Sequence, residues 1–341
     1  MPPNGTASLF GRATCITGLG IYLPEKVVTN DDLAQVLETS DEWVRQRTGI
    51  GARRVAAPCE AASDLGIPAA RAALADARLD PADVGLVIAA TVSPDQVMPA
   101  TACRIAYESG CVNAGAFDLV VGCSGFVFGL GMASSAVAAG LHEHVLVVGA
   151  EALSRIMDWE DRSTAVLFGD GGGAAVVSVS PPGGGRFLGF ELGGDGSGGG
   201  FLTLPAGGSR IPASHETVDQ RLHYIKMNGK EVYKFATRIV EHVSGAVLAR
   251  CGRTVADIDL FIPHQANMRI IEGAAKRLGI PMEKIYTNLQ RYGNTSGASI
   301  PLCLTEARAE GRLHDGDLVL LMGFGAGLSW GACLMEWGAS V

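Results

Sequence analysis

The chain has 341 residues, of which 48% are hydrophobic and 18% are charged, and this balance excludes an intrinsically disordered protein. Its formal net charge of −8 at pH 7 argues against a nucleic-acid-binding surface spread over the whole protein. An anionic ligand would therefore have to be held by a local basic patch.

The start of the chain shows no targeting signal. Residues 1–6 lack the basic segment and the apolar core of a signal peptide. No apolar run approaches the roughly 18 residues needed to cross a bilayer. We therefore expect a cytoplasmic protein with no membrane insertion.

A first βαβαβ unit is predicted between residues 82 and 149. Apolar runs of strand length occupy residues 84–90, 116–121 and 144–149, with helix-like segments between them. Cys123 follows the second run and precedes an alanine-rich stretch, which places it at the first turn of a helix. The amides and dipole of a helix start favour a thiolate, so Cys123 is a candidate nucleophile. Taken alone, a buried cysteine is more often structural.

Glycine-rich segments divide the chain. Residues 169–173 lie between two β-like runs and indicate a turn, while residues 181–185 and 193–208 indicate loops. We place the boundary between two domains there, with an N-terminal half of residues 1–180 and a C-terminal half of residues 181–341. A nucleotide-binding interpretation of residues 193–198 is weak, because they do not join a strand to a helix.

The second half repeats the pattern of the first. Residues 256–264 resemble residues 82–90 and end at His264, Gly293-Asn294-Thr295 corresponds to Gly122-Cys123-Ser124, and residues 317–323 form another apolar strand. Residues 323–327 follow, where closely approaching backbone could supply amide donors. Alone, His264 could fill or cap a strand end and Asn294 could be a helix N-cap.

The repeat predicts an α/β protein with two pseudo-symmetric βαβαβ halves and buried, mainly parallel sheets. Parallel sheets place active residues at the carboxyl ends of strands. If a pseudo-twofold axis relates the halves, the strand ends that carry Cys123, His264 and Asn294 can converge.

Several motifs in a fixed order then make the chain resemble the β-ketoacyl-acyl-carrier-protein synthase III family. This resemblance implies a thiolase-like fold, layered α-β-α-β-α, and spans nearly the whole chain. The motifs are Thr39-Ser40-Asp41-Glu42-Trp43, Arg47-Thr48-Gly49-Ile50, the Cys123 turn, Asp161-Arg162, Phe168-Gly169-Asp170-Gly171, Met227-Asn228-Gly229, His264-Gln265-Ala266-Asn267, Gly293-Asn294-Thr295-Ser296 and Gly325-Ala326-Gly327.

The resemblance implies a catalytic triad of Cys123, His264 and Asn294. Cys123 would attack an acyl-CoA thioester, and the backbone amides of Cys123 and Ala326 would form the oxyanion hole. His264 and Asn294 would stabilise the enolate left when a malonyl thioester loses carbon dioxide. An amide cannot abstract a proton, so Asn294 favours decarboxylation over the deprotonation chemistry of thiolases.

This chemistry requires no metal and no redox cofactor, with CoA thioester as substrate. The eight cysteines contain no Cys-x-x-Cys pair, so zinc spacing is absent; they are Cys15, Cys59, Cys103, Cys111, Cys123, Cys251, Cys303 and Cys333.

The resemblance also assigns the binding surfaces. We expect CoA to contact Thr39, Trp43, Arg47, Arg162 and Asn267. The acyl pocket is assigned to Met98, Leu153, Leu167 and Phe168, with Met98 reaching the pocket of a neighbouring subunit in a homodimer. Trp43 could instead be a packing residue, Arg47 and Arg162 could form structural ion pairs, and Met98 could pack the dimer core.

An acidic acyl-carrier protein needs a basic docking surface, for which we propose Lys234, Arg238, Arg269, Lys276 and Arg277. Ordinary solvated helix faces are the alternative. The expected function is condensation of an acyl-CoA starter with malonyl-acyl-carrier protein, which starts type II fatty-acid synthesis. A starter synthase or acyltransferase of polyketide metabolism and a catalytically silent acyl-CoA-binding protein are the alternatives.

Overall fold

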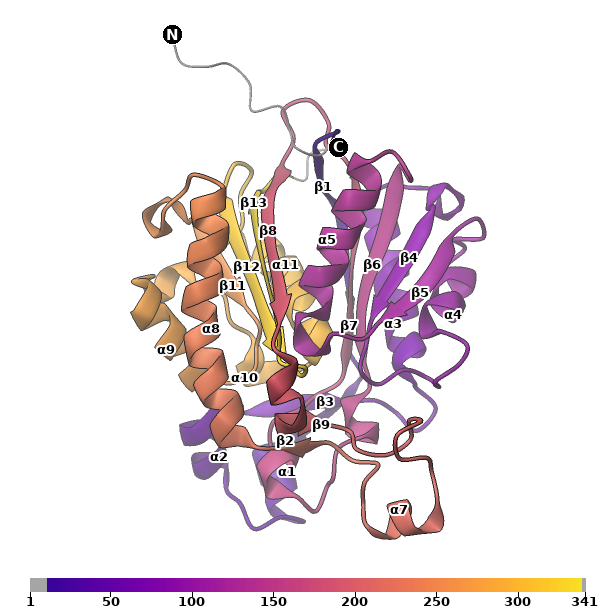
Figure 1. Ribbon diagram of the computed structural model, residues 1–341, viewed down its shortest axis with the longest axis vertical. Helices are drawn as coiled ribbons and strands as arrows, with labels where there is room; N and C mark the ends of the chain where they lie inside the picture. The colour runs from indigo at the N-terminus through magenta and orange to yellow at the C-terminus, as the bar shows by residue number, and fades with distance from the viewer. Residues whose placement is uncertain (1–10, 339–341) are drawn as a thin grey trace.

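Two β-sheets form the centre of the computed structural model, which describes residues 11–338 (Figure 1). The first sheet has the order β1-β7-β6-β4-β5, formed by β1 (Thr14–Tyr22), β4 (Leu86–Ala90), β5 (Gly115–Leu119), β6 (His144–Glu151) and β7 (Gly171–Val179). The second sheet has the order β11-β12-β13-β8, formed by β8 (Arg186–Gly194), β11 (Leu260–Pro263), β12 (Leu318–Gly325) and β13 (Ser329–Glu336). The proposed boundary between residues 180 and 181 stays a prediction.

The sheets are mixed, so the prediction of mainly parallel sheets is wrong. In the first sheet β4 pairs in parallel with β5 and β6, whereas β7 and β1 are antiparallel to their neighbours. In the second, only β11 and β12 are parallel. In the second sheet β12 and β13 are antiparallel because only three residues join them, too few for a crossover helix.

The two halves nevertheless share one strand order. The second half lacks a full counterpart of edge strand β5 and has only an isolated parallel bridge between Phe261 and Ile285. With Ile285 in that place, the order Ile285-β11-β12-β13-β8 matches β5-β4-β6-β7-β1. The predicted pseudo-symmetry is therefore present in the topology.

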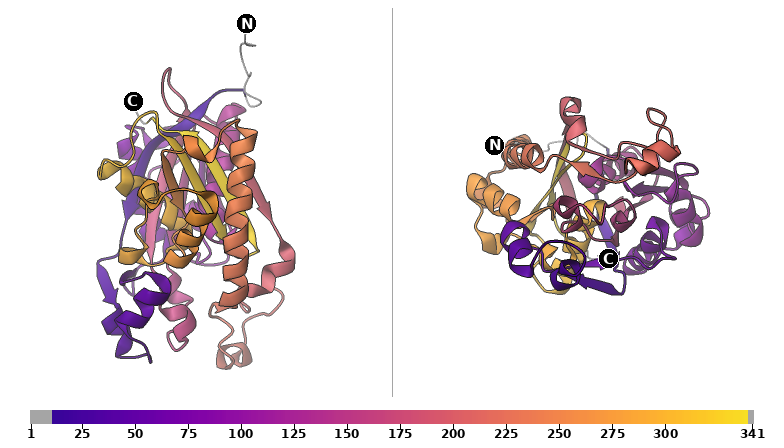
Figure 2. Two further views of the ribbon diagram at one scale, coloured as in Figure 1. Left: turned by 90° about the vertical axis from the view of Figure 1, so that its left-hand side faces the viewer. Right: turned by 90° about the horizontal axis from the view of Figure 1, so that it is seen from below.

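Helices cover both outer faces and fill the space between the sheets (Figures 1 and 2). Helices α3 (Ala62–Asp76) and α4 (Thr101–Glu108) pack on the first sheet, and α8 (Gly229–Arg250) and α9 (Met268–Leu278) cover the second. Helices α5 (Gly125–Ala138) and α11 (Ser299–Ala309) lie between the sheets. The predicted α-β-α-β-α layering is confirmed.

Helix α5 is rich in small residues because sheets press on it from two sides. A Cβ atom on Gly129 would lie 2.7 Å from Cγ1 of Val147 in the first sheet. A Cβ atom on Gly131 would lie 3.2 Å from Cδ1 of Leu192 in the second sheet. The glycines thus allow α5 to pack closely against both sheets.

Glycines also explain an error in the sequence interpretation. Residues 171–173 open strand β7 and do not form the predicted turn. A Cβ atom on Gly172 would lie 2.2 Å from the carbonyl oxygen of Leu65, and one on Gly173 would lie 2.7 Å from Cγ of Pro301. Helices α3 and α11 therefore approach opposite faces of β7, which leaves no room for side chains.

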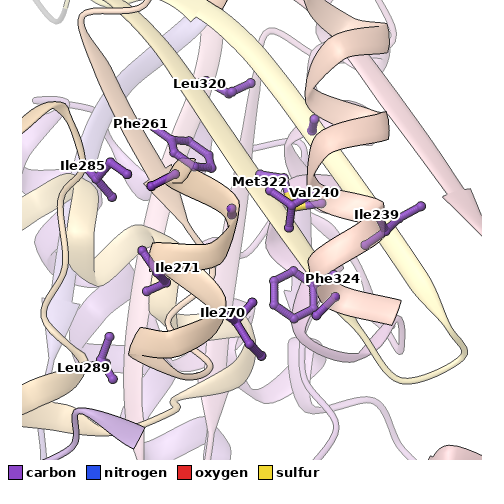
Figure 3. Close-up of a cluster of buried hydrophobic side chains, with 14 of the residues drawn as sticks. Ile239, Val240, Phe261, Ile270, Ile271, Ile285, Leu289, Leu320, Met322 and Phe324 are labelled. Carbon is purple, nitrogen blue, oxygen red and sulfur yellow. The ribbon is translucent and has the colours of Figure 1, made fainter. Parts of the chain in front are cut away.

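A hydrophobic cluster joins α8 and α9 to the second sheet (Figure 3). Helix α9 begins at the cap residue Asn267 and ends at Gly279, whose φ is +71°. Its buried Ile270 and Ile271 face a cluster that includes Phe261 of β11. This packing holds the end of β11, where His264 follows.

Short elements gather where the carboxyl ends of β4, β6, β11 and β12 lie, at the lower end of Figure 1. They are β2 (Lys26–Thr29), α1 (Asn30–Ala34), α2 (Asp41–Thr48), β3 (Ala52–Val55), α6 (Arg162–Ala165), β9 (Leu202–Thr203), α7 (His215–Asp219), β10 (Lys226–Met227) and α10 (Leu289–Tyr292).

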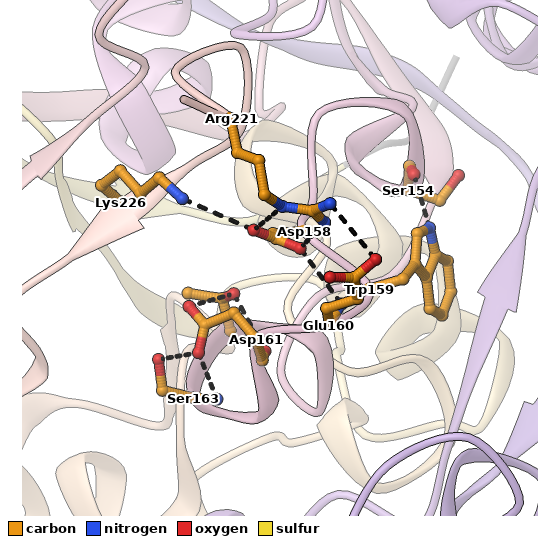
Figure 4. A network of polar contacts seen from close by, with 9 residues as sticks. Ser154, Asp158, Trp159, Glu160, Asp161, Ser163, Arg221 and Lys226 are labelled. Carbon is orange, nitrogen blue, oxygen red and sulfur yellow. Dashed lines mark hydrogen bonds and ion pairs between the residues drawn. The ribbon is translucent and has the colours of Figure 1, made fainter. Parts of the chain in front are cut away.

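A polar network holds the end of the long connection between β9 and β10, which contains α7 (Figure 4). Arg221 forms an ion pair with Asp158, whose carboxylate also lies 3.4 Å from Nζ of Lys226. The hydrogen bond from Arg221 lowers the pKa of Asp158 to about 2. Asp158 therefore remains ionised throughout the physiological range and ties residues 221–226 to the segment before α6.

Within residues 11–338, no helix combines the length and the apolar character that a membrane span requires. The absence of a signal peptide was inferred from residues 1–6, which lie outside the described residues.

Candidate active site

Cys123 lies on a sharp turn between β5 and α5. Residues 122–124 form one turn of 3₁₀ helix, and α5 begins at Gly125. Gly122 has φ +57°, and a Cβ atom there would lie 2.7 Å from the backbone nitrogen of Ala326. Glycine is therefore needed before the nucleophile, both for the conformation and for the close approach.

The turn of Cys123 touches the segment that follows β12. A Cβ atom on Gly325 would lie 2.4 Å from the backbone nitrogen of Cys123. The hydroxyls of Ser124 and Ser329 lie 2.8 Å apart, and each lies 2.8 Å from the carbonyl oxygen of Val121. The backbones of Cys123 and Ala326 are thus held side by side, as the predicted oxyanion hole requires.

His264 follows β11 and is buried. Its backbone nitrogen donates to the carbonyl of Met322 at 2.7 Å, and its ring packs edge-on against Phe324 with centroids 5.4 Å apart. Its Nδ1 atom is buried without a hydrogen-bond partner. Burial lowers the pKa of His264 to about 3, so the imidazole is neutral and can donate only through one nitrogen.

Asn294 is fixed by its backbone and by its side-chain oxygen. Its N–H donates to the carbonyl of Leu167 at 2.8 Å, and its carbonyl accepts from Gly169 at 3.0 Å. Its Oδ1 accepts from the backbone N–H of Ser296 at 2.8 Å. This bond orients the carboxamide, and among residues 11–338 no partner occupies its NH2 group.

Cys123, His264 and Asn294 line one pocket of about 320 Å³, although 171 residues separate the first from the last (294 − 123). Apolar side chains form much of the remaining wall: Val166, Leu167, Phe168, Leu202, Val232, Ile270 and Phe324. An apolar wall strengthens hydrogen bonds to any charge that develops inside the pocket.

Burial has the largest effect on the pKa of the Cys123 thiol and raises it, although the helix start lowers the pKa, as predicted. Cys123 is only 8% exposed, and burial raises the pKa of its thiol to about 12. Nearby Glu151 raises the pKa further, while the Ser296 hydroxyl lowers it. The protonated thiol is therefore the resting form at neutral pH, because desolvation outweighs the favourable backbone dipoles.

Three of the five predicted CoA residues, Trp43, Arg47 and Asn267, line the pocket, and Arg162 does not line it but lies against Trp43. Guanidinium groups of Arg47 and Arg162 lie 5.0 and 4.6 Å from the ring centroid of half-buried Trp43. Asn267 caps α9 through Oδ1, and its Nδ2 donates to the carbonyl of Arg47 at 3.1 Å. Thr39 does not line the pocket, and its hydroxyl is buried without a partner.

The predicted acyl-pocket residues separate into two groups. Leu167 and Phe168 line the pocket, and Leu153 packs in the buried cluster that contains Phe168. Met98 does not line it and is 84% exposed. Within a single chain, Met98 therefore makes no part of this cavity.

The predicted docking residues are exposed on α8 and α9, which pack against each other. Lys234 pairs with Glu231 at 2.7 Å and Arg277 with Glu241 at 3.5 Å. Arg269 also lines the pocket.

Burial of His264 predicts a pH-dependent stability. The unfolded chain protonates a histidine near its ordinary pKa of 6.5, whereas folded His264 stays neutral down to about 3. The free energy of unfolding should therefore fall as pH drops from 6.5 towards 3, by at most about 1.4 kcal/mol per pH unit from this group. Urea denaturation at several pH values measures the slope. A His264→Gln variant with an unchanged slope would contradict this assignment.

The sequence interpretation missed several residues near the thiol. Met227 and Tyr233 line the pocket, Ser296 lies beside Cys123, and the buried carboxyl group of Glu151 lies close to it. Glu151 stands two positions after the apolar run 144–149, and nothing local in the sequence shows that its side chain is buried. Among the described residues, no group of three or more His, Cys, Asp or Glu side chains is arranged to hold a metal ion.

Comparison with known proteins agrees with this geometry. Residues 117–196 match the 3-oxoacyl-[acyl-carrier-protein (ACP)] synthase III family, and residues 248–337 match its C-terminal family. The chain is 53% identical to a β-ketoacyl-[acyl-carrier-protein] synthase III of Caldanaerobacter subterraneus subsp. tengcongensis over 95% of this chain and 98% of the relative.

Solved structures give the same result. The synthase III of Thermus thermophilus has a TM-score of 0.88 and 46% identity, covering 95% of this chain and 99% of that one. A priming β-ketosynthase of the R1128 polyketide pathway has a TM-score of 0.87 and 36% identity, covering 98% of this chain and all of the other. The fold is thiolase-like, and the chain belongs to the β-ketoacyl-[acyl-carrier-protein] synthase III family.

Proposed function

We propose that this pocket condenses an acyl-CoA starter with malonyl-acyl-carrier protein and so starts type II fatty-acid synthesis. The observation that carries the proposal is the meeting of Cys123, His264 and Asn294 in one largely apolar pocket. Higher identity to synthase III relatives than to the priming ketosynthase favours this function over polyketide starter synthesis.

In the first half-reaction, Sγ of Cys123 attacks the thioester carbonyl of the acyl-CoA. A carbon–sulfur bond to the enzyme forms, the bond to CoA breaks, and the thiol proton leaves with CoA. The backbone amides of Cys123 and Ala326 stabilise the intermediate oxyanion. Because the resting thiol has a pKa of about 12, proton removal has to accompany the attack.

In the second half-reaction, the malonyl group loses carbon dioxide and leaves an enolate. Neutral His264 and the NH2 group of Asn294 donate hydrogen bonds to the enolate oxygen. The carbanion attacks the acyl carbonyl, the bond to Sγ breaks, and the thiolate takes up a proton from solvent. The products are 3-oxoacyl-carrier protein and carbon dioxide, and no step needs a redox cofactor.

Acyl-CoA enters past Trp43, Arg47 and Arg162. The adenine stacks on Trp43, and the guanidinium groups bind phosphate or cover the base. Asn267 contributes mainly by capping α9 beside this mouth. The acyl chain points towards Leu167, Phe168 and the cluster of Leu153.

Intact-protein mass spectrometry tests the proposal directly. We expect a stable acyl adduct on Cys123 after incubation with a short-chain acyl-CoA such as acetyl-CoA or isobutyryl-CoA. Malonyl-carrier protein should discharge it with release of carbon dioxide. Discharge by an alcohol or amine instead would favour the alternative acyltransferase, and no adduct with any thioester would favour a silent binding protein.

The malonyl-carrier protein docks on the cations of α8 and α9. Lys234, Arg238, Arg269, Lys276 and Arg277 belong to this surface. Lys234 and Arg277 already have acidic partners and Arg238 lies near Asp195, so Arg269 and Lys276 are the strongest candidates.

Charge reversal tests this docking surface. We expect R269E/K276E to raise KM for malonyl-carrier protein on the order of tenfold and to weaken its salt dependence, because the carrier is acidic. Acylation by acyl-CoA should change much less. R71E, on helix α3 over the other sheet, is the control. Equal losses in both half-reactions would contradict the docking role.

A homodimer completes the proposal and would place Met98 at the partner's pocket. Strand β5 is an unpaired sheet edge, and large apolar side chains are exposed around it: Val97, Met98, Tyr107, Val112, Phe117 and Val120. Exposed edges with apolar surroundings favour association. Sedimentation equilibrium should give twice the chain mass, and a monomer at micromolar concentration would contradict this. The cytoplasmic location stays a prediction.

A further inference from the structure

Glu151 is a buried carboxyl group that the proposed chemistry does not use. It is the last residue of β6, is 0% exposed, and forms no ion pair with a cation among residues 11–338. An unpaired buried carboxylate is costly unless hydrogen bonds compensate it. Its partners therefore indicate what it contributes.

One oxygen of Glu151 binds the loop that follows β4. Oε2 accepts from the hydroxyl of Ser93 at 2.6 Å, the hydroxyl of Thr91 at 3.2 Å and the N–H of Val92 at 3.1 Å. Ser93 Oγ accepts from the N–H of Ala152 at 2.9 Å, so its own hydrogen is available to Glu151. The N-terminal half thus holds the carboxyl group firmly in place.

The other oxygen reaches the C-terminal half. Oε1 accepts from the N–H of Gly297 at 3.4 Å and shares the N–H of Val92, at 3.3 Å, with Oε2. A Cβ atom on Gly297 would lie 3.0 Å from the carbonyl oxygen of Ala90, and one on Gly149 would lie 2.2 Å from the carbonyl oxygen of Gly297. The turn of residues 296–298 therefore packs directly against the ends of β4 and β6, and Glu151 accepts a hydrogen bond from it.

The preceding residue, Ser296, connects this hydrogen bond to the pocket. Its φ of +45° lies in the left-handed region, which a serine keeps only where its surroundings hold it. Its N–H donates to Oδ1 of Asn294 at 2.8 Å. Its buried hydroxyl lies beside both Cys123 and Glu151.

We infer that Glu151 is a positioning residue for Asn294: it anchors Gly297 and so keeps Ser296 in the conformation whose N–H orients the Asn294 carboxamide. The inference rests on the proposed function, because it assigns Asn294 its task in the second half-reaction. Glu151, a residue of the N-terminal half, would thus hold in place the Asn294 donor of the C-terminal half.

Glu151→Gln tests the inference with little change in shape. The carboxyl group accepts hydrogen bonds from Thr91, Val92, Ser93 and Gly297. Glutamine has only one acceptor oxygen, and its NH2 group would face some of these donors without forming a hydrogen bond. We expect acylation of Cys123 by acetyl-CoA to stay within about threefold of the wild type. Condensation of the acyl-enzyme with malonyl-carrier protein should fall about 10- to 100-fold, as expected for a misplaced enolate donor. E151D, which keeps the carboxyl group, should recover part of the loss.

A double-mutant cycle separates positioning from general damage. If Glu151 acts through Asn294, E151Q/N294A should condense no more slowly than N294A alone. Asp170 provides the matched control, because it is also fully buried and its carboxyl group accepts hydrogen bonds from Ala56 and Ser154 but none from residues 294–297. D170N should show no selective loss of condensation. The inference would be overturned if the losses in condensation rate of E151Q and N294A multiplied in the double variant. It would also be overturned if E151Q lowered the rates of both half-reactions equally.

The outcome can be separated from a failure of the proposed function. If the wild type is acylated but never condenses with malonyl-carrier protein, the function is wrong whatever the variants do. A crystal structure of E151Q, or of E151D if E151Q does not fold, then decides the inference without any substrate. Displacement of Ser296 with a turned Asn294 carboxamide supports it, and an unmoved segment overturns it.

Discussion

Replacing Cys123 with alanine should abolish the acyl adduct and lower condensation on the order of 10⁴-fold or more. The expected loss is this large because both half-reactions pass through the same sulfur atom, and within residues 11–338 Cys123 is the only cysteine that lines the pocket. Intact-protein mass spectrometry measures the adduct, and release of carbon dioxide measures condensation.

Cys59 provides the control for this prediction. It is an exposed cysteine away from the pocket wall, and Cys59→Ser should keep both the adduct and the condensation rate. An acyl adduct that survives in C123A, or that disappears in C59S, would show that another cysteine is the nucleophile.

Replacing Asn294 with alanine should lower condensation about 10²- to 10³-fold while acylation of Cys123 changes little. The enolate oxygen loses one of its two donors, and each such donor in an apolar site has an effect of this size. N294D keeps the shape but replaces the NH2 donor with an acceptor, so its condensation rate should be at least as low. Single-turnover measurements of each half-reaction separate the two steps.

His264→Ala should give the same selective loss, because the neutral imidazole supplies the other donor. If either variant slowed acylation as much as condensation, the residue would be serving the nucleophile and not the enolate.

The sequence contained enough information to predict the layers, the strand ends and the three central residues of the site. Internal repetition placed Cys123 and Asn294 at equivalent turns, and the structure has matching strand orders around them. Repeated apolar runs are a local signal, and local signals survive in a single sequence.

Features that depend on distant contacts were beyond the sequence. The glycines of β7 suggested a turn, because nothing local reveals that Leu65 and Pro301 press on the strand. The helix start beside Cys123, which favours a thiolate, is visible in the sequence, while the burial that raises the pKa of the thiol is not. Glu151 was overlooked for the same reason, since its donors come from segments about 60 and 146 residues away.

Helix α5 links the packing between the two sheets to the position of Cys123, whose 3₁₀ turn directly precedes the helix. Gly129 faces one sheet and Gly131 faces the other, so the missing side chains set how far apart the sheets stand. The nucleophile belongs to the first sheet and both enolate donors to the second half. A methyl group added at Gly129 or Gly131, about two helical turns from Cys123, would therefore push the sheets apart and widen the gap across which the new carbon–carbon bond has to form.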